Sequence, residues 1–355
     1  MKPALCIAVV SMLFGVHLAH AACPNDAVFL TFTFFNTPKD TAHQVHGYSL
    51  RANGATEPCQ VFVVPSLFLP GEGGQAIAID KRGSLHVAIF GIPTVDIFAR
   101  NAHGNQAPIR SFTFQTNDLN GIGVDSRLND FVLNFRPSTA GVLVAPNKSS
   151  GVLTNPIRIT DPNIGEDYQS LAIDDDDNLV IAGYDSQGRT VIDTFWTRKT
   201  FNKPPLLRSI TGDNTGLPLH GPGLGSRNNL SLAIDPQTEE LFVYNVSPDL
   251  TQIQVSVFAN KANGNVAPVR VISGPATGIT GPSRDAAANK IAVSSDGRLF
   301  VSEPNGLILV FAPGAKGNVA PSQRIQDSTS VPTTQGGIAV RSAGGGQQNE
   351  NDDTQ

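Results

Sequence analysis

The chain has 355 residues, of which only 15% are charged, whereas glycine (34) and proline (25) are abundant. Sparse charge with many turn formers favours short strands joined by tight turns and argues against a helical protein. The formal net charge of -5, with no visible basic patch, argues against a nucleic acid partner.

The N-terminus has the order of a secretory signal peptide. Lys2 precedes an apolar run at 4–18 and the small residues Ala-His-Ala at 19–21, so cleavage is expected after Ala21. A transmembrane helix is the alternative, but the run is shorter than the roughly 20 residues that span a bilayer, and no transmembrane segment is predicted. We therefore expect a secreted or periplasmic protein.

Cleavage removes Cys6 and leaves Cys23 and Cys59 as the mature cysteines. An even pair in an oxidising compartment is most simply a disulfide, with two unrelated buried thiols as the alternative. Lipid attachment at Cys23 is a further alternative for the N-terminus. It is less favoured because His20 stands where a bacterial lipobox usually has leucine.

One phrase recurs along the chain: an apolar strand that ends in an acidic or polar residue, a turn, and a second apolar strand. Its five copies begin at 77–80, 122–125, 171–174, 232–235 and 291–294. A third alternating strand follows, as at 95–98, 255–258 and 309–311. With a fourth strand after a linker, each unit is typical of a propeller blade.

The linker between the third and fourth strands has a recurrent sequence motif. It reads Ala-His-Gly-Asn-Gln-Ala-Pro at 102–108, Ala-Asn-Gly-Asn-Val-Ala-Pro at 262–268 and Ala-Lys-Gly-Asn-Val-Ala-Pro at 315–321. Glycine and asparagine tolerate positive φ, and proline, which lacks an N–H, suits an edge strand. The third repeat departs from this text at 201–205, where it reads Phe-Asn-Lys-Pro-Pro.

The two ends of the repeat region complete a sixth unit. Residues 337–340 repeat the inner-strand phrase, while 28–31, 45–48 and 52–61 read as a second strand, a third strand and a linker with a fourth strand. The sequence thus predicts an all-β, six-bladed β-propeller of four-stranded blades over 22–343, whose ring is closed by N-terminal strands pairing with the C-terminal strand. A signal peptide (1–21) precedes it and a disordered polar tail (344–355) follows.

The closed ring gives the cysteines a role. Cys23 and Cys59 fall near the starting ends of the second and fourth strands, which run parallel about 9.5 Å apart, two strand spacings. Since that separation exceeds the usual disulfide Cα distance, residues 23–26 must bend across the third strand. The bond would then hold the seam of the ring.

The repeated phrase resembles the NHL-repeat propellers and, more loosely, the gluconolactonase and strictosidine-synthase-like six-bladed propellers. The resemblance covers residues 26–341 and rests on Ile-Ala-Val/Ile-Asp/Ser, two polar residues, a glycine, and Leu-Phe-Val. It implies architecture more than activity, because these families include protein-, RNA- and ligand-binding modules as well as lyases and metal-dependent lactonases.

Inner strands start and second strands end on the same face of a propeller, where the central channel usually binds ligands. Polar residues at these places are our candidate ligand-binding residues: Gln75, Asn120, Asn134, Tyr168, Tyr184, Asp185, Asn229, Asn245 and Glu303. The alternative is a set of solvated loop ends, because asparagine and aspartate are also ordinary turn residues. The lactonase resemblance implies a divalent metal on hard oxygen ligands, which Glu303, Asn245, Asp185 and Asn134 would imitate.

Three further features have structural alternatives. The run Asp174–Asp177 looks like a calcium loop but aligns with the inner hairpin turn, so a solvated turn is predicted. His43 and His46 point to opposite faces of a strand, which argues against zinc. The insertion 211–227, which contains His220, is either a binding loop or a tolerated surface insertion.

Two functions follow. The preferred one is a monomeric, non-enzymatic binding module for a protein, peptide or glycan on the channel face, with no cofactor expected and no catalytic residue assigned. The alternative is a metal-dependent hydrolase or lyase that acts on a small ester or lactone with calcium or another divalent metal. Converging carboxylates or histidines would favour the enzyme, and a wall of amides and apolar residues would favour the binding module.

Overall fold

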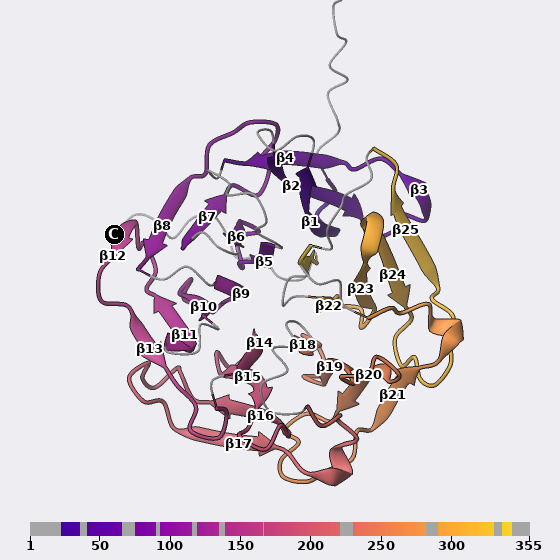
Figure 1. Cartoon of the computed structure of the whole chain (residues 1–355). Helices are drawn as coiled ribbons and strands as arrows, with labels where there is room; N and C mark the ends of the chain where they lie inside the picture. Colours follow the sequence, from indigo (N-terminus) through magenta and orange to yellow (C-terminus); the bar gives the residue numbers. More distant parts are fainter. Residues whose placement is uncertain are drawn as a thin grey trace, which may run out of the picture.

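The computed structural model describes residues 23–35, 41–65, 75–89, 93–115, 119–134, 139–165, 167–220, 230–281, 290–329 and 336–342. In these ranges the strands form six sheets arranged in a ring (Figure 1). The predicted all-β, six-bladed propeller is confirmed. The expected signal peptide (1–21) and polar tail (344–355) lie outside the described residues.

Each blade has four antiparallel strands, which are named below from the axis outward, and the blades are numbered by inner strand. Blade 1 has β5 (Gln75–Ile79), β6 (Leu85–Ile89), β7 (Thr94–Phe98) and β8 (Arg110–Phe114). Blade 2 has β9 (Leu119–Val124), β10 (Asp130–Asn134), β11 (Gly141–Ala145) and β13 (Ile157–Ile159). Blade 3 has β14 (Asp167–Ile173), β15 (Leu179–Tyr184), β16 (Thr190–Phe195) and β17 (Leu206–Ile210).

Blade 4 has β18 (Leu230–Ile234), β19 (Leu241–Val246), β20 (Ile253–Phe258) and β21 (Arg270–Ser273). Blade 5 has β22 (Ile291–Val293), β23 (Leu299–Glu303), β24 (Leu307–Phe311) and β25 (Gln323–Asp327). Blade 6 has β26 (Ile338–Arg341), β1 (Ala27–Phe35), β2 (Thr41–Ser49) and β4 (Gln60–Val64). Two short strands, β3 (Gly54–Thr56) and β12 (Gly151–Leu153), lie in linkers.

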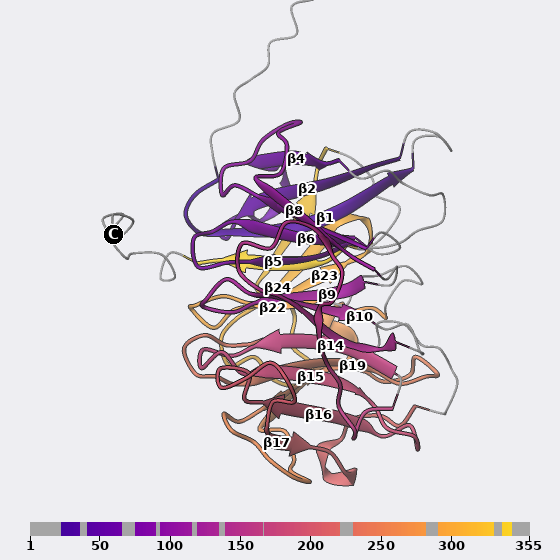
Figure 2. The ribbon, with the colours of Figure 1, turned by 90° about the vertical axis from the view of Figure 1, so that its left-hand side faces the viewer.

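The core is divided among the junctions between blades. Strands such as β6, β10 and β11 are buried along their whole length, because each sheet is covered on both faces. Six apolar clusters result, one at each junction; that between blades 6 and 1, for example, contains Phe29, Phe62 and Phe98. Seen edge-on, the strands run between the two faces of the ring (Figure 2).

The recurrent acid after the inner strand closes the hairpin turn. Asp125 Oδ1 accepts hydrogen bonds from the N–H groups of Arg127 (3.0 Å) and Asn129 (2.8 Å). Asp80, Asp174 and Asp235 do the same in their blades. Because the carboxylate caps its own turn, the acid has a structural role that explains its recurrence, and no catalytic or ligand-binding role is needed.

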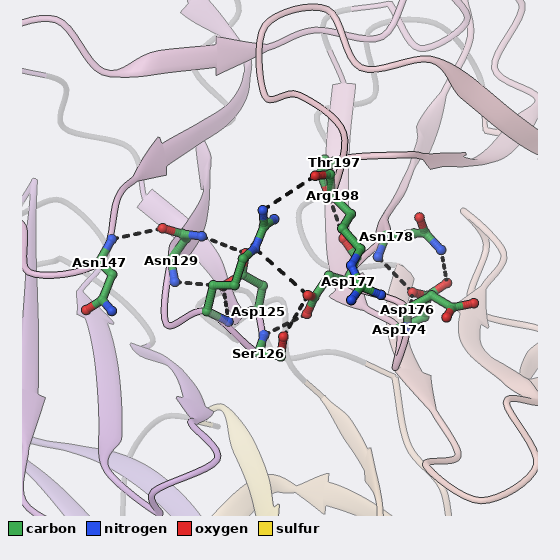
Figure 3. A network of polar contacts seen from close by, with 11 residues as sticks. Asp125, Ser126, Asn129, Asn147, Asp174, Asp176, Asp177, Asn178, Thr197 and Arg198 are labelled. Carbon is green, nitrogen blue, oxygen red and sulfur yellow. Dashed lines mark hydrogen bonds and ion pairs between the residues drawn. The ribbon is translucent and has the colours of Figure 1, made fainter. Parts of the chain in front are cut away.

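The aspartate run forms this turn as predicted, but the turn is not wholly solvated. Asp175 and Asp176 are exposed, whereas Asp177 is only 4% exposed. Its carboxylate accepts hydrogen bonds from Ser126 of blade 2, at 2.6 Å from the N–H and 2.7 Å from Oγ (Figure 3). Asp177 therefore stabilises the junction between blades 2 and 3.

The recurrent linker text joins neighbouring blades. Its glycine forms a parallel bridge to the outer strand of the preceding blade, as Gly104 does with Phe62, donating to Val61 O and accepting from Val63 N (both 2.8 Å). Gly264 and Gly317 bridge Ile210 and Ile272 in the same way, while β12 and β3 extend the contact to three residues on β8 and β25. All five bridging glycines have positive φ, which explains the recurrent residue type.

The seam of the ring lies in blade 6. Its inner strand β26 pairs with β1, with Val28 opposite Val340. Cys23 and Cys59 form the predicted disulfide, with a Cα–Cα distance of 4.9 Å. Gly47 of β2, the intervening strand, makes the crossing possible, because a Cβ there would lie 2.7 Å from the Phe29 ring and 3.0 Å from Cys23 Sγ.

Candidate functional site

The predicted ligand-binding residues lie toward one face, on which the outer strand of each blade connects to the inner strand of the next; we call it the crossing face. Asn134 stands opposite Leu119 and Asn245 opposite Leu230, so the ends of second strands meet the starts of inner strands. Tyr184 stands likewise opposite Asp167. Gln75 begins β5, and Asn229 lies outside the described residues.

Most of these side chains are buried within the blades rather than arranged around an open rim. Asn134 Nδ2 donates to Thr139 O (2.6 Å), Asn245 Nδ2 donates to Val243 O (2.9 Å), and Tyr168 Oη accepts from the N–H of Asp161 (2.6 Å). Asn120 is also buried. These residues are therefore not the solvated loop ends of the alternative interpretation, because their amides and hydroxyls are buried and stabilise the loop ends.

Glu303 belongs to a buried polar cluster that the sequence did not reveal. Its carboxylate lies 3.4 Å from Lys290 Nζ and accepts hydrogen bonds from the N–H and hydroxyl of Thr280. Lys290 Nζ also donates to Thr280 O (3.1 Å) and lies over the Tyr244 ring. Burial lowers the pKa of Lys290 to about 8 and raises the pKa of Glu303, while each charge opposes the shift of the other.

The residues suggested for a metal do not fit one in this arrangement. Glu303 faces the Lys290 ammonium, and Asp185 caps a surface turn with its Oδ2 2.7 Å from Arg189 Nε. Among the residues that the structure describes, no group of three or more histidine, cysteine, aspartate or glutamate side chains is placed to hold a metal ion.

The crossing face carries two exposed leucines, one in the connection from blade 3 to blade 4 and one within blade 4. Leu219 (64% exposed) precedes His220, whose ring stacks on Tyr184 at 4.1 Å and hydrogen-bonds to the backbone of Val246. Leu250 (57% exposed) lies in the β19–β20 turn with φ 59. The backbone at both places is fixed by hydrogen bonds, from the N–H of His220 to Gly188 O (2.7 Å) and from the N–H of Leu250 to Ser247 O (2.9 Å).

At the opposite face, each inner strand has an aliphatic residue at an equivalent place near its end. The last apolar residue of the inner-strand phrase is half-buried in every blade, and these six equivalent residues are Ile79, Val124, Ile173, Ile234, Val293 and Val340.

A pocket of about 30 Å³ lies between blades 3 and 4, lined by residues such as Asp174, Arg208 and Glu239. This volume admits a water molecule but not an organic ligand.

Two buried carboxyl groups lie side by side beneath the crossing face: Asp161, in the connection from β13 to β14, and Asp193 of β16. Asn163 bridges them, donating its N–H to Asp161 (2.8 Å) and Nδ2 to Asp193 (2.7 Å). Burial and then the charge of Asp193 raise the pKa of Asp161 to about 7, because two adjacent carboxylates cannot both ionise cheaply.

Stability is therefore expected to fall as pH rises from about 4 to 7. The folded pKa of Asp161 (about 7) lies above the unfolded value of 3.8, so the folded chain retains a proton that the unfolded chain has lost. Asp193→Asn removes the second charge and is expected to add on the order of 2 kcal/mol at pH 8 and little at pH 4. Urea unfolding at both pH values measures this; an equal effect at the two values would contradict the influence of Asp193 on Asp161.

Comparisons with known proteins support the fold alone. A protein of unknown function from Bacteroides caccae matches with a TM-score of 0.53 and 10% identity over 89% of this chain and 98% of its own. A functionally unknown protein from Desulfotomaculum acetoxidans DSM 771 matches with a TM-score of 0.50 and 12% identity over 89% and 99%. No family model and no curated protein matches the sequence. No helix in the described ranges is long and apolar enough to cross a membrane.

Proposed function

We propose that the protein is a non-enzymatic binding module that holds a protein or peptide on its crossing face, outside the cytosol. The exposed Leu219 and Leu250 carry this proposal. Leucine rarely adopts positive φ, so Leu250 (φ 59) retains a strained backbone while its side chain faces water. Such an arrangement is understandable if a partner covers the side chain.

Other observations support the proposal. Two of the suggested metal ligands are engaged with cationic side chains, Glu303 with Lys290 and Asp185 with Arg189. The disulfide Cys23–Cys59 suits an oxidising compartment, as does the signal peptide expected at 1–21. The resemblance to NHL-repeat propellers, which include protein-binding modules, agrees with this function.

The test is partner capture with matched surface variants. Leu219→Asp with Leu250→Asp should remove the captured partner, because a charge replaces each apolar contact. Ile109→Asp is the control, since Ile109 is as exposed as Leu219 (64%) but lies at the start of β8. Immobilised mature protein is exposed to the extracytoplasmic fraction of the source cells, and bound proteins are identified by mass spectrometry.

A partner lost from the leucine double variant and retained by Ile109→Asp supports the proposal. The same captured proteins with all three chains would contradict it. A stoichiometric divalent metal in the purified protein, with a melting temperature that falls on chelation, would instead support the metal-dependent hydrolase or lyase.

A further inference from the structure

One of the six blade junctions lacks the linker bridge. The outer strands of blades 1, 3, 4, 5 and 6 are each contacted by a linker glycine of the next blade, at Phe112, Ile210, Ile272, Ile325 and Phe62. Each contacted residue is buried and stands opposite an aliphatic residue of the third strand, as Val95 stands opposite Phe112. Ile159, which is buried and stands opposite Val142, is the equivalent residue in β13 of blade 2.

No bridge reaches Ile159, although 154–165 and 196–205, which contain β13 and the facing linker, are both described. That linker belongs to blade 3 and lacks the Gly-Asn sequence of the recurrent linker motif. It turns instead toward the β9–β10 hairpin of blade 2, where Phe201 packs edge-to-face on Phe131 and under Arg127. Together with the Asp177–Ser126 contact, this holds the junction while leaving the edge of β13 uncovered.

The uncovered edge presents a defined pair of hydrogen-bonding groups. At the bridged junctions, the glycine N–H donates to the residue before the contacted one and the glycine carbonyl accepts from the residue after it, as with Val61 and Val63. The corresponding groups of β13 are the carbonyl of Arg158 and the N–H of Thr160. Outside the β11–β13 ladder, no backbone hydrogen bond reaches either group within the described part of the chain.

Many of the exposed apolar side chains belong to the outer elements of the same two blades. Of the nine large apolar side chains that are exposed in the described ranges, five belong to blades 2 and 3: Val152, Ile157, Trp196, Leu206 and Leu207. Figure 1 shows β13 and β17 on the outer circumference in neighbouring blades. An open strand edge flanked by apolar residues is the usual setting for strand addition by another polypeptide.

We propose that the outer edge of β13 binds an extended, glycine-containing segment of a partner polypeptide, in the position that the linkers of this chain occupy at the other five junctions. The five intramolecular bridges define the chemistry of the occupant. It runs parallel to β13, and a glycine with positive φ pairs with Arg158 and Thr160. This surface lies on the circumference and is independent of the crossing face.

The probe is a synthetic peptide with the sequence of residues 259–268, which contains Gly264, added to the full mature protein. Amide hydrogen exchange should slow at Thr160, by about fivefold at four-fifths occupancy. The Val63 amide, which already donates to Gly104 O, should not change. Trp196 is the only tryptophan, so its fluorescence gives a second, independent titration.

The control peptide carries valine in place of Gly264 and should bind much more weakly, because valine disfavours positive φ. In the protein, Thr160→Pro removes the N–H and should abolish binding; if this variant does not fold, the exchange measurement on the natural chain decides alone. Equal protection by both peptides, or none at Thr160, would overturn the proposal. Protection of Thr160 without peptide that grows with protein concentration would also overturn it, by showing that a second copy occupies the edge.

Discussion

Cys59→Ser is expected to lower the free energy of unfolding by about 4 kcal/mol. The disulfide closes a loop of 36 residues, and the loss of that constraint on the unfolded chain accounts for an effect of this size. The bond joins the segment before β1 to the start of β4, so its loss also frees the strand that pairs with β26. Urea unfolding of the mature variant, followed by Trp196 fluorescence, gives the difference.

The control is the unmodified chain under reducing conditions, which should unfold at the same urea concentration as the serine variant. If the oxidised chain, the reduced chain and Cys59→Ser all share one midpoint, the disulfide contributes nothing to the seam. A midpoint shift with an unchanged slope would show that the variant reaches the same folded state with lower stability.

Asp177→Gly is expected to lower the free energy of unfolding by about 3 kcal/mol. The substitution removes a buried carboxylate and leaves the N–H and hydroxyl of Ser126 without their acceptor (Figure 3). Glycine is chosen because Asp177 has φ 59, a conformation that glycine adopts without strain. The loss is therefore attributable to the contact between blades 2 and 3.

Asp176→Gly is the matched control, because it places the same residue one position earlier in the same turn. Asp176 is exposed, and its backbone N–H rather than its carboxylate makes the local hydrogen bond, to Asp174. We expect a loss below about 1 kcal/mol. Equal losses in the two variants would mean that the turn, and not the junction, determines the effect.

The fold could be predicted because each recurrent residue type has the same structural role in every unit where it occurs. Asp80 and Asp125 recur because a carboxylate closes the hairpin turn, and the linker glycines recur because the bridge needs positive φ. A single chain repeats both requirements many times, so periodicity alone reveals the blade. The disulfide could be predicted on a different ground, because Cys23 and Cys59 are the two cysteines that remain after the expected cleavage.

The environment of the candidate site residues could not be predicted in the same way, because burial at the crossing face depends on the connections that cover it. Asn134 and Asn245 stand at the expected strand ends but lie inside the blades. The Asp161–Asp193 contact joins blades 2 and 3 and has no local pattern. Lys290 had one signal: the residue before the inner-strand phrase is small in the other five copies and is lysine only there.

The pairing of β1 with β26 determines when the ring can close during synthesis of the chain. The strand that is synthesised first in the propeller receives its inner neighbour only when residues 338–341 have emerged, so the ring cannot close until all six blades have been synthesised. Until then one edge of β1 is unpaired and available to other chains. A nonsense mutation anywhere before residue 338 would therefore leave an aggregation-prone edge instead of a shortened but closed ring.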